Sequence, residues 1–155
     1  MEIKDFRNIA HKILKENNFE KVKSRYYRPG QGFLCEIYLQ KSSYGSVFYI
    51  NFDFFLGNFE KPYVINRDSA QTYTPHVEGR FYFGEKYGYA CEYPHWEQEQ
   101  LLTVFLENMR KVILPPFDVG KQYLRDYYGT MYNSLINRKK TEEILFEKVG
   151  DSSMT

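Results

Sequence analysis

The first 17 residues have apolar side chains at the spacing of an amphipathic helix, with lysine and arginine on the opposite face. The apolar face consists of Ile3, Phe6, Ala10, Ile13 and Leu14. The spacing predicts a helix over 2–17 that ends at Asn17-Asn18, because asparagine tolerates the left-handed conformation that often closes a helix.

Strand-like patterns follow. Residues 21–28 are expected to form a first strand, closed by the turn signal Pro29-Gly30-Gln31-Gly32. Residues 33–41 and 47–55 alternate apolar and polar side chains, which predicts two strands with one apolar face each. Strands of this kind form an antiparallel sheet that is packed on one side. Residues 79–84 predict a fourth, short strand, with Phe81 and Phe83 pointing inward.

Two registers keep the apolar faces of the 33–41 and 47–55 strands together. A two-residue turn at Tyr44-Gly45 would place Glu36 opposite Asp53, and like charges directly opposite are unfavourable. We therefore expect a four-residue loop over 42–45. That loop pairs Lys41 with Ser46, Leu39 with Phe48, Ile37 with Ile50 and Cys35 with Phe52.

After the strand pattern, the chain first loses its regular spacing of apolar residues and then takes up a helical spacing. Residues 57–78 contain Pro62 and Pro75 and predict a long irregular connection. A helical stripe from Glu97 is expected to end at Pro115-Pro116. Its apolar members are Leu101, Leu102, Phe105, Met109, Val112 and Ile113. Asp118 is expected to cap a helix over 119–128, and a last helical segment over 130–146 follows.

This order of elements predicts an α+β fold. We expect a single antiparallel sheet of about four strands, with one face covered by the N-terminal helix and the C-terminal helices. The 155 residues fit one domain over 1–149 with a flexible tail over 150–155. We expect the N-terminal helix to pack against the apolar face of the central hairpin.

Composition narrows the class of protein. No apolar run approaches a membrane span, and two cysteines cannot form a secreted disulfide scaffold, so a cytoplasmic protein is expected. The net charge is +1, and residues 31–100 carry 5 basic and 9 acidic side chains. That balance disfavours nucleic acid and anionic membranes as partners.

The chain carries no phosphate-binding glycine loop, no CxxC pair, no HExxH and no Gly-x-Ser-x-Gly motif. A zinc site can be assembled on paper from His76, Cys91, Glu92 and His95, but no second closely spaced ligand pair supports it. We therefore expect no metal, no cofactor and no catalytic residues. Cys35 lies on an apolar strand face and predicts a buried thiol.

The polar face of the predicted sheet is the candidate site for a ligand or partner. Its members are Tyr38, Gln40, Tyr49, Asn51, Asp53, Arg80 and Tyr82. The favoured interpretation gives Arg80 a surface ion pair with Asp53 or Glu36. The alternative makes Arg80, Asn51 and the two tyrosines Tyr38 and Tyr49 one wall of a pocket beneath the 57–78 loop, where Arg80 reads a carboxylate or phosphate.

The stretch over 39–52, a Leu-Gln-Lys-Ser strand followed by an aromatic strand, resembles the DUF 4304 family of uncharacterised, mostly bacterial domains. The resemblance covers roughly residues 5–120. It includes a first helix ending near Asn18-Phe19, a strand with Tyr26-Tyr27-Arg28 and a later strand with Arg80. It implies no established activity and no catalytic residues. Neutralisation of secreted toxins, suspected for some neighbours of such small domains, is an analogy only.

Three functions remain open from sequence. The first is a noncatalytic protein-binding module, immunity-like, that uses the tyrosine-rich sheet face or the 57–78 loop. The second is a small-ligand binder or enzyme with a cleft between the sheet and that loop. The third is RNA binding on exposed aromatics, which the acidic middle of the chain disfavours. The oligomeric state cannot be read from the sequence.

Overall fold

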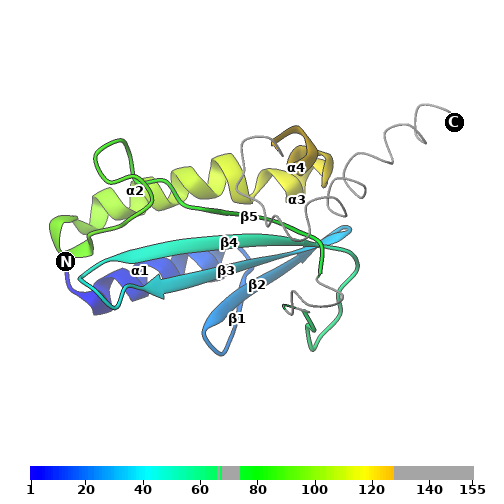
Figure 1. The fold of residues 1–155 in the computed structure, drawn as a ribbon, viewed down its shortest axis with the longest axis horizontal. Coiled ribbons are helices and arrows are strands. Elements are labelled where there is room, and N and C mark those ends of the chain that lie inside the picture. The colour runs from blue at the N-terminus through cyan, green and yellow to red at the C-terminus, as the bar shows by residue number, and fades with distance from the viewer. Residues whose placement is uncertain (66, 68–73, 128–155) are drawn as a thin grey trace, which may run out of the picture.

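The computed structural model describes residues 1–65, 67 and 74–127. Its sheet is an antiparallel meander in which each strand pairs with the next, in the order β1-β2-β3-β4-β5 (Figure 1). The strands are β1 (Glu20–Val22), β2 (Arg25–Gly30), β3 (Phe33–Lys41), β4 (Phe48–Leu56) and β5 (His76–Arg80). The α+β class with a single antiparallel sheet is confirmed, with five strands in place of about four.

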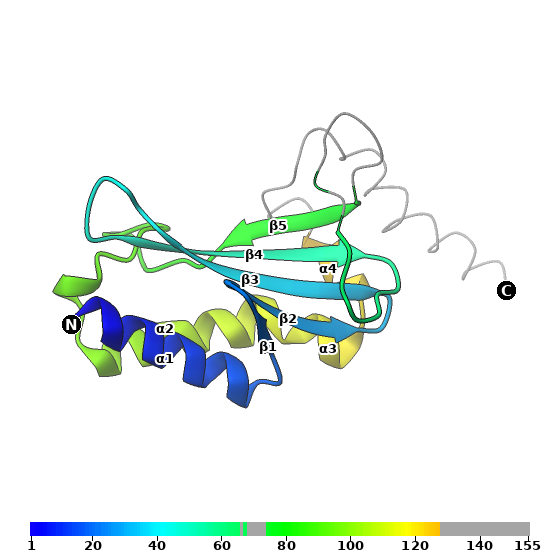
Figure 2. The same cartoon turned by 90° about the horizontal axis from the view of Figure 1, so that it is seen from below.

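The helices lie together on one face of this sheet (Figure 2). They are α1 (Ile3–Glu16), η1 (Tyr93–His95), α2 (Gln98–Asn108), the π-helical turn η2 (Met109–Ile113), α3 (Pro115–Val119) and α4 (Gln122–Tyr127). The opposite face is turned away from these helices, and it is the face on which a site can lie. The expected helix over 130–146 and the expected tail over 150–155 lie outside the described residues.

Helix α1 forms where its apolar spacing predicts it, within one residue at each end. At its start the backbone N–H of Glu2 donates to the Asp5 carboxylate at 3.2 Å, which satisfies one free donor of the first turn. At its end Asn17 is the C-cap, and Asn18 adopts a left-handed φ of 66°. The asparagine pair therefore stops the helix as expected.

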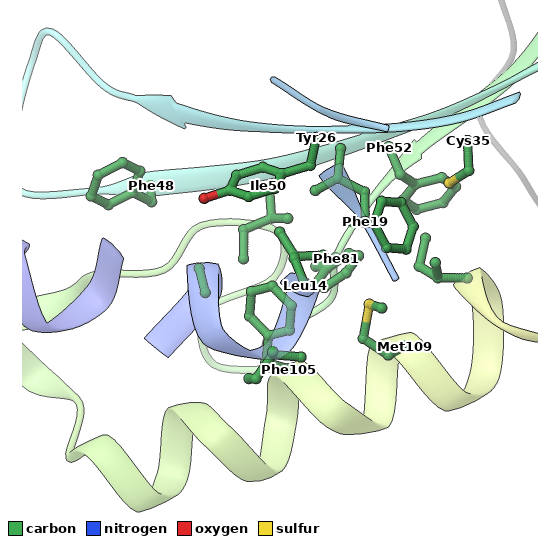
Figure 3. Close-up of a cluster of buried hydrophobic side chains, with 14 of the residues drawn as sticks. Leu14, Phe19, Tyr26, Cys35, Phe48, Ile50, Phe52, Phe81, Phe105 and Met109 are labelled. Atoms are coloured by element: carbon green, nitrogen blue, oxygen red, sulfur yellow. The ribbon is translucent and has the colours of Figure 1, made fainter. Parts of the chain in front are cut away.

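The main core lies between the sheet and the helices (Figure 3). The ring of Phe6 from α1 stacks on Phe48 of β4, with centroids 4.2 Å apart, and Phe81 meets Phe105 of α2 edge to face at 4.9 Å. The expected packing of α1 on the apolar face of the hairpin is confirmed, although Ile3 is only partly buried. Leu102, which belongs to the expected stripe of α2, is 43% exposed.

Two strand expectations are wrong in their bounds. The single strand expected over 21–28 is the hairpin of β1 and β2, which turns at Lys23 with a φ of 58°. The strand expected from Gly79 begins earlier, at His76, so the last residues of the expected 57–78 loop belong to β5. The outward-facing positions of β5 carry polar side chains, so its sequence lacks the apolar run by which a strand is usually predicted.

The helix expected over 119–128 is present as the shorter α4, but the expected cap at Asp118 is wrong. Pro115 and Pro116 start α3, as proline does at first helical positions, and Asp118 lies within that helix. Gly120, with a φ of 100°, separates α3 from α4. The proline pair ends one helix and begins the next, because a missing N–H is harmless in a first turn.

The register of the central hairpin differs from the expected one. Leu39 pairs with Ile50, and Glu36 lies directly opposite Asp53. The last pair is Lys41 with Phe48, so the connection spans 42–47 rather than 42–45. The expectation failed because it treated two facing carboxylates as an uncompensated cost, and the outer face supplies the compensation.

Candidate functional site

The sheet face turned away from the helices is ordered in rows of residues that pair across β2, β3, β4 and β5. The arginine row is Arg25, Tyr38, Asn51 and Arg80. The carboxylate row is Tyr27, Glu36, Asp53 and Glu78. The apolar row is Pro29, Leu34, Phe55 and His76. Side chains alternate between the faces of a strand, so these three rows share one surface.

The arginine row has a guanidinium stacked on a tyrosine at each side. Arg25 lies 4.3 Å from the ring centroid of Tyr38, and Arg80 lies 4.6 Å from that of Tyr49. The Nε of Arg80 donates to the Asn51 side-chain oxygen at 2.8 Å. The Asn51 amide donates in turn to Gln40 at 2.9 Å. These contacts hold two cations in fixed positions on the open part of the face.

The carboxylate row contains a side chain that is more deeply buried than those of the arginine row. Glu36 is 4% exposed and pairs with Arg25 of β2 at 2.9 Å and with Arg67 from the segment after β4. Burial, together with a hydrogen bond to Glu36, raises the pKa of Tyr27 to about 12. Two cations on one carboxylate balance a charge that would otherwise be costly to bury.

The other end of the carboxylate row meets His76. The Nδ1 of His76 lies 2.7 Å from an Asp53 oxygen and 3.7 Å from a Glu78 oxygen. Burial raises the pKa of Asp53 to about 7, although the hydrogen bond to His76 acts in the opposite direction. Burial also lowers the pKa of His76, but the hydrogen bond to Asp53 and the charges of Asp53 and Glu78 together outweigh burial, and the net shift of the pKa is upward. Each group thus depends on its neighbour for its charge state.

The segment after β4 covers the buried end of the face. Arg67 lies 5.2 Å from the ring centroid of Phe55, and Tyr63 lies 5.4 Å from that of Tyr27. Phe55 itself is 2% exposed. The face therefore has a covered end, around Glu36 and Phe55, and an open end, which holds the arginine row.

These contacts give the physical reason for the observed register. Arg25 and Arg67 neutralise Glu36, and His76 bonds to Asp53, so the two facing carboxylates do not stand as bare like charges. A comparison of residue pairs within the β3–β4 hairpin could not include these partners, because Arg67 and His76 come from outside the hairpin.

Most of the residues expected at the site gather there. Tyr38, Gln40, Tyr49, Asn51 and Arg80 form the stacked and hydrogen-bonded group just described. Asp53 lies one row deeper, beside His76. The ion pair expected between Arg80 and Asp53 or Glu36 is wrong, since Arg80 binds Asn51 instead.

Tyr82 follows the end of β5 and flanks the arginine row rather than joining it. Its ring packs against Tyr89 at 5.6 Å, and its backbone N–H and carbonyl both bind the buried side chain of Asn108 on α2. Asn108 thus fixes the path of the chain as it leaves β5. The Tyr82 ring is 46% exposed beside the site.

Sequence reasoning missed the roles of Arg25, Arg67, His76 and Glu78. One signal was present: Glu36 lies between Cys35 and Ile37 in a strand whose neighbouring positions are buried, so its carboxylate needed partners. A second signal was the alternation His76-x-Glu78, which places both side chains on one face of a strand. Arg67 gave no local signal, because it reaches the face from an irregular segment.

The structure does not bring together the four zinc ligands considered from the sequence, which are His76, Cys91, Glu92 and His95. Cys91 forms a bridge with Phe48 at one end of β4, whereas His76 pairs with Phe55 at the other end. Both cysteines are buried, as expected for Cys35, and burial raises the pKa of each thiol, to about 12 for Cys91. They are not reactive thiols.

Comparison with known proteins places the chain in a family. The model of the family described as a domain of unknown function, DUF4304, matches residues 10–119, and the chain belongs to that family. No curated protein and no solved structure matches it. Among the helices of the described residues, none has both the length and the hydropathy that a membrane-spanning helix needs.

Proposed function

We propose that the chain is a noncatalytic protein-binding module, immunity-like in that it acts by stoichiometric binding, and that its partner presents an acidic surface. The observation that carries the proposal is the pair of tyrosine-stacked arginines, Arg25 and Arg80, at the two ends of the arginine row. Arginine and tyrosine dominate the binding energy of protein interfaces, and stacking reduces the entropy lost on binding.

The charges of the face favour carboxylates in the partner. Glu36 is neutralised by two arginines and Asp53 is bonded to His76, so the acids lie in the covered end. Arg80 is exposed and uses Nε for Asn51, while its terminal nitrogens still carry four N–H groups. A guanidinium held in this way can form paired hydrogen bonds with a carboxylate.

The same contacts argue against an RNA platform. Bases bind such platforms by stacking on exposed aromatic rings. Arg25 already covers one side of the Tyr38 ring, and Arg80 covers one side of Tyr49. The two tyrosines therefore support arginines rather than bases. A cytoplasmic location agrees with two free, buried thiols.

The proposal is tested by affinity capture from an extract of the cells that express the chain natively, followed by binding measurements with the purified partner. A partner that binds the wild type and not Arg80→Ala supports the proposal. A metabolite that raises the melting temperature of the wild type but not of Arg80→Ala would instead support a small-ligand site. Retention of RNA on a filter at low salt would support the third function.

A further inference from the structure

We propose that Asp53, His76 and Glu78 form a binding site for one divalent transition-metal ion, with Zn²⁺ as the best-matched ion. These three side chains project from neighbouring positions of β4 and β5 on the outer face of the sheet. One donor atom from each lies within 4.8 Å of the other two. A zinc ion bound by three protein ligands takes water in its fourth position.

The donor set selects the class of metal. It contains one imidazole nitrogen and two carboxylates, whereas Ca²⁺ and Mg²⁺ prefer sites made of oxygen alone. The distances of 2.7 and 3.7 Å from Nδ1 of His76 to Asp53 and Glu78 bracket the spacing of about 3.4 Å that tetrahedral ligands of zinc require.

The imidazole is held in a fixed orientation. The ring of His76 stacks on Phe55, with centroids 5.9 Å apart and planes 24° apart, and it is 1% exposed. This contact directs Nδ1 toward both carboxylates. Ligands whose orientation is fixed by their surroundings bind metal more tightly than free ones, because less freedom is lost.

The charges also fit a divalent ion. Glu36, the third acid of the carboxylate row, is paired with Arg25 and Arg67, so these two arginines leave the other two acids to His76. A protonated His76 cancels one of the two negative charges of Asp53 and Glu78. A divalent ion with a neutral His76 cancels both, which is a better balance for buried groups.

The site is reachable from solvent on one side. The side chain of Glu78 is 28% exposed and that of Asp53 is 14% exposed, whereas His76 lies beneath them. An ion can therefore enter at Glu78 without displacement of the sheet.

The test is calorimetric titration of the untagged full chain with ZnCl₂. We expect one ion per chain, and we expect Glu78→Gln to weaken zinc binding by more than about tenfold, since even indirect partners of metal ligands are worth that much. Glu85→Gln, which removes an exposed carboxylate after β5, is the matched control and should bind zinc as the wild type does.

A second measurement keeps the proposal testable if Glu78→Gln is unstable. Co²⁺ added to the wild type should give the visible absorption of a four-coordinate nitrogen and oxygen site. Zinc affinity weaker than about 1 mM, or absent Co²⁺ bands, would overturn the proposal. Binding that is lost in His95→Gln and kept in Glu78→Gln would also overturn it, because it would place the ion on an exposed histidine.

Discussion

Glu36 of β3 lies directly opposite Asp53 of β4, so two carboxylates face each other on the outer side of the sheet. Their neighbours explain how the fold accepts this pair. Arg25 and Arg67 bind Glu36, and His76 binds Asp53. A like-charge pair of this kind is unfavourable by itself, and it makes this part of the face depend on residues from three other parts of the chain.

Substitution of Glu36 tests this dependence. Glu36→Gln removes the charge that holds Arg25 and Arg67, and we expect the free energy of unfolding to fall by about 1–3 kcal/mol. Chemical denaturation measures the change. Glu20→Gln is the control: its ion pair with Lys61 is solvent-exposed, so we expect a clearly smaller loss than for Glu36→Gln. Equal effects of the two substitutions would show that the buried ion pairs of Glu36 stabilise the fold no more than an exposed ion pair does.

The contact between α1 and the sheet predicts a larger effect. Phe6 is fully buried and stacks on Phe48, so Phe6→Ala should lower the free energy of unfolding by about 3–5 kcal/mol. Tyr44→Ala changes a ring that is 99% exposed and should stay within about 0.5 kcal/mol of the wild type. A mild effect of Phe6→Ala would mean that α1 does not pack on the sheet as described.

Gly79 is expected to resist substitution because of Phe52. A Cβ atom at Gly79 would lie 2.5 Å from the Phe52 ring, which is buried and cannot easily move. We expect Gly79→Ala to cost about 1–3 kcal/mol in thermal or chemical unfolding. At Gly45 nothing lies within 4 Å of an added Cβ, so Gly45→Ala should be close to neutral.

Alkaline pH should weaken the contribution of Tyr27. Its pKa is raised to about 12 from an ordinary value of 10.0, so the unfolded chain loses this proton first as the pH rises. The stability that the Tyr27 hydroxyl adds is present below pH 10 and is lost progressively between pH 10 and 12.

We therefore expect the difference in unfolding free energy between the wild type and Tyr27→Phe to shrink over that range of pH. Tyr44→Phe, on an exposed ring, serves as the control for general alkaline effects. A difference that stays constant from pH 10 to 12 would show that the Tyr27 hydroxyl is not held in the folded state as described.

The spacing of apolar and polar residues predicted those parts of the fold that depend on interactions between residues close together in the sequence. The apolar stripe of α1, the stop at Asn17-Asn18 and the inward faces of β3 and β4 follow from spacing alone, and all are observed. The hairpin register was not accessible in this way. It depends on Arg67, which is 31 positions after its partner Glu36, and on His76, which is 23 positions after its partner Asp53. Each reaches its partner only in the folded chain.

The candidate site likewise has features that follow from residue spacing and features that depend on contacts between distant segments. Strand alternation was sufficient to place Tyr38, Tyr49 and Asn51 on one face, and Arg80 with them. It could not show that the arginines stack on the tyrosines or that His76 lies beside Asp53 and Glu78, because β5 was expected to begin after both His76 and Glu78. Contacts between side chains of separate segments decide the chemistry of this face.

The most direct test of the proposed function compares affinities of the captured partner for three forms of the chain. The account predicts that Tyr49→Ala combined with Arg80→Ala weakens binding about thirtyfold or more, as expected for interface residues that carry much of the binding energy. Lys4→Ala combined with Lys12→Ala removes two exposed cations from α1, on the opposite side of the sheet, and should bind as the wild type does. Equal affinities of the Tyr49/Arg80 variant and the wild type would contradict the account.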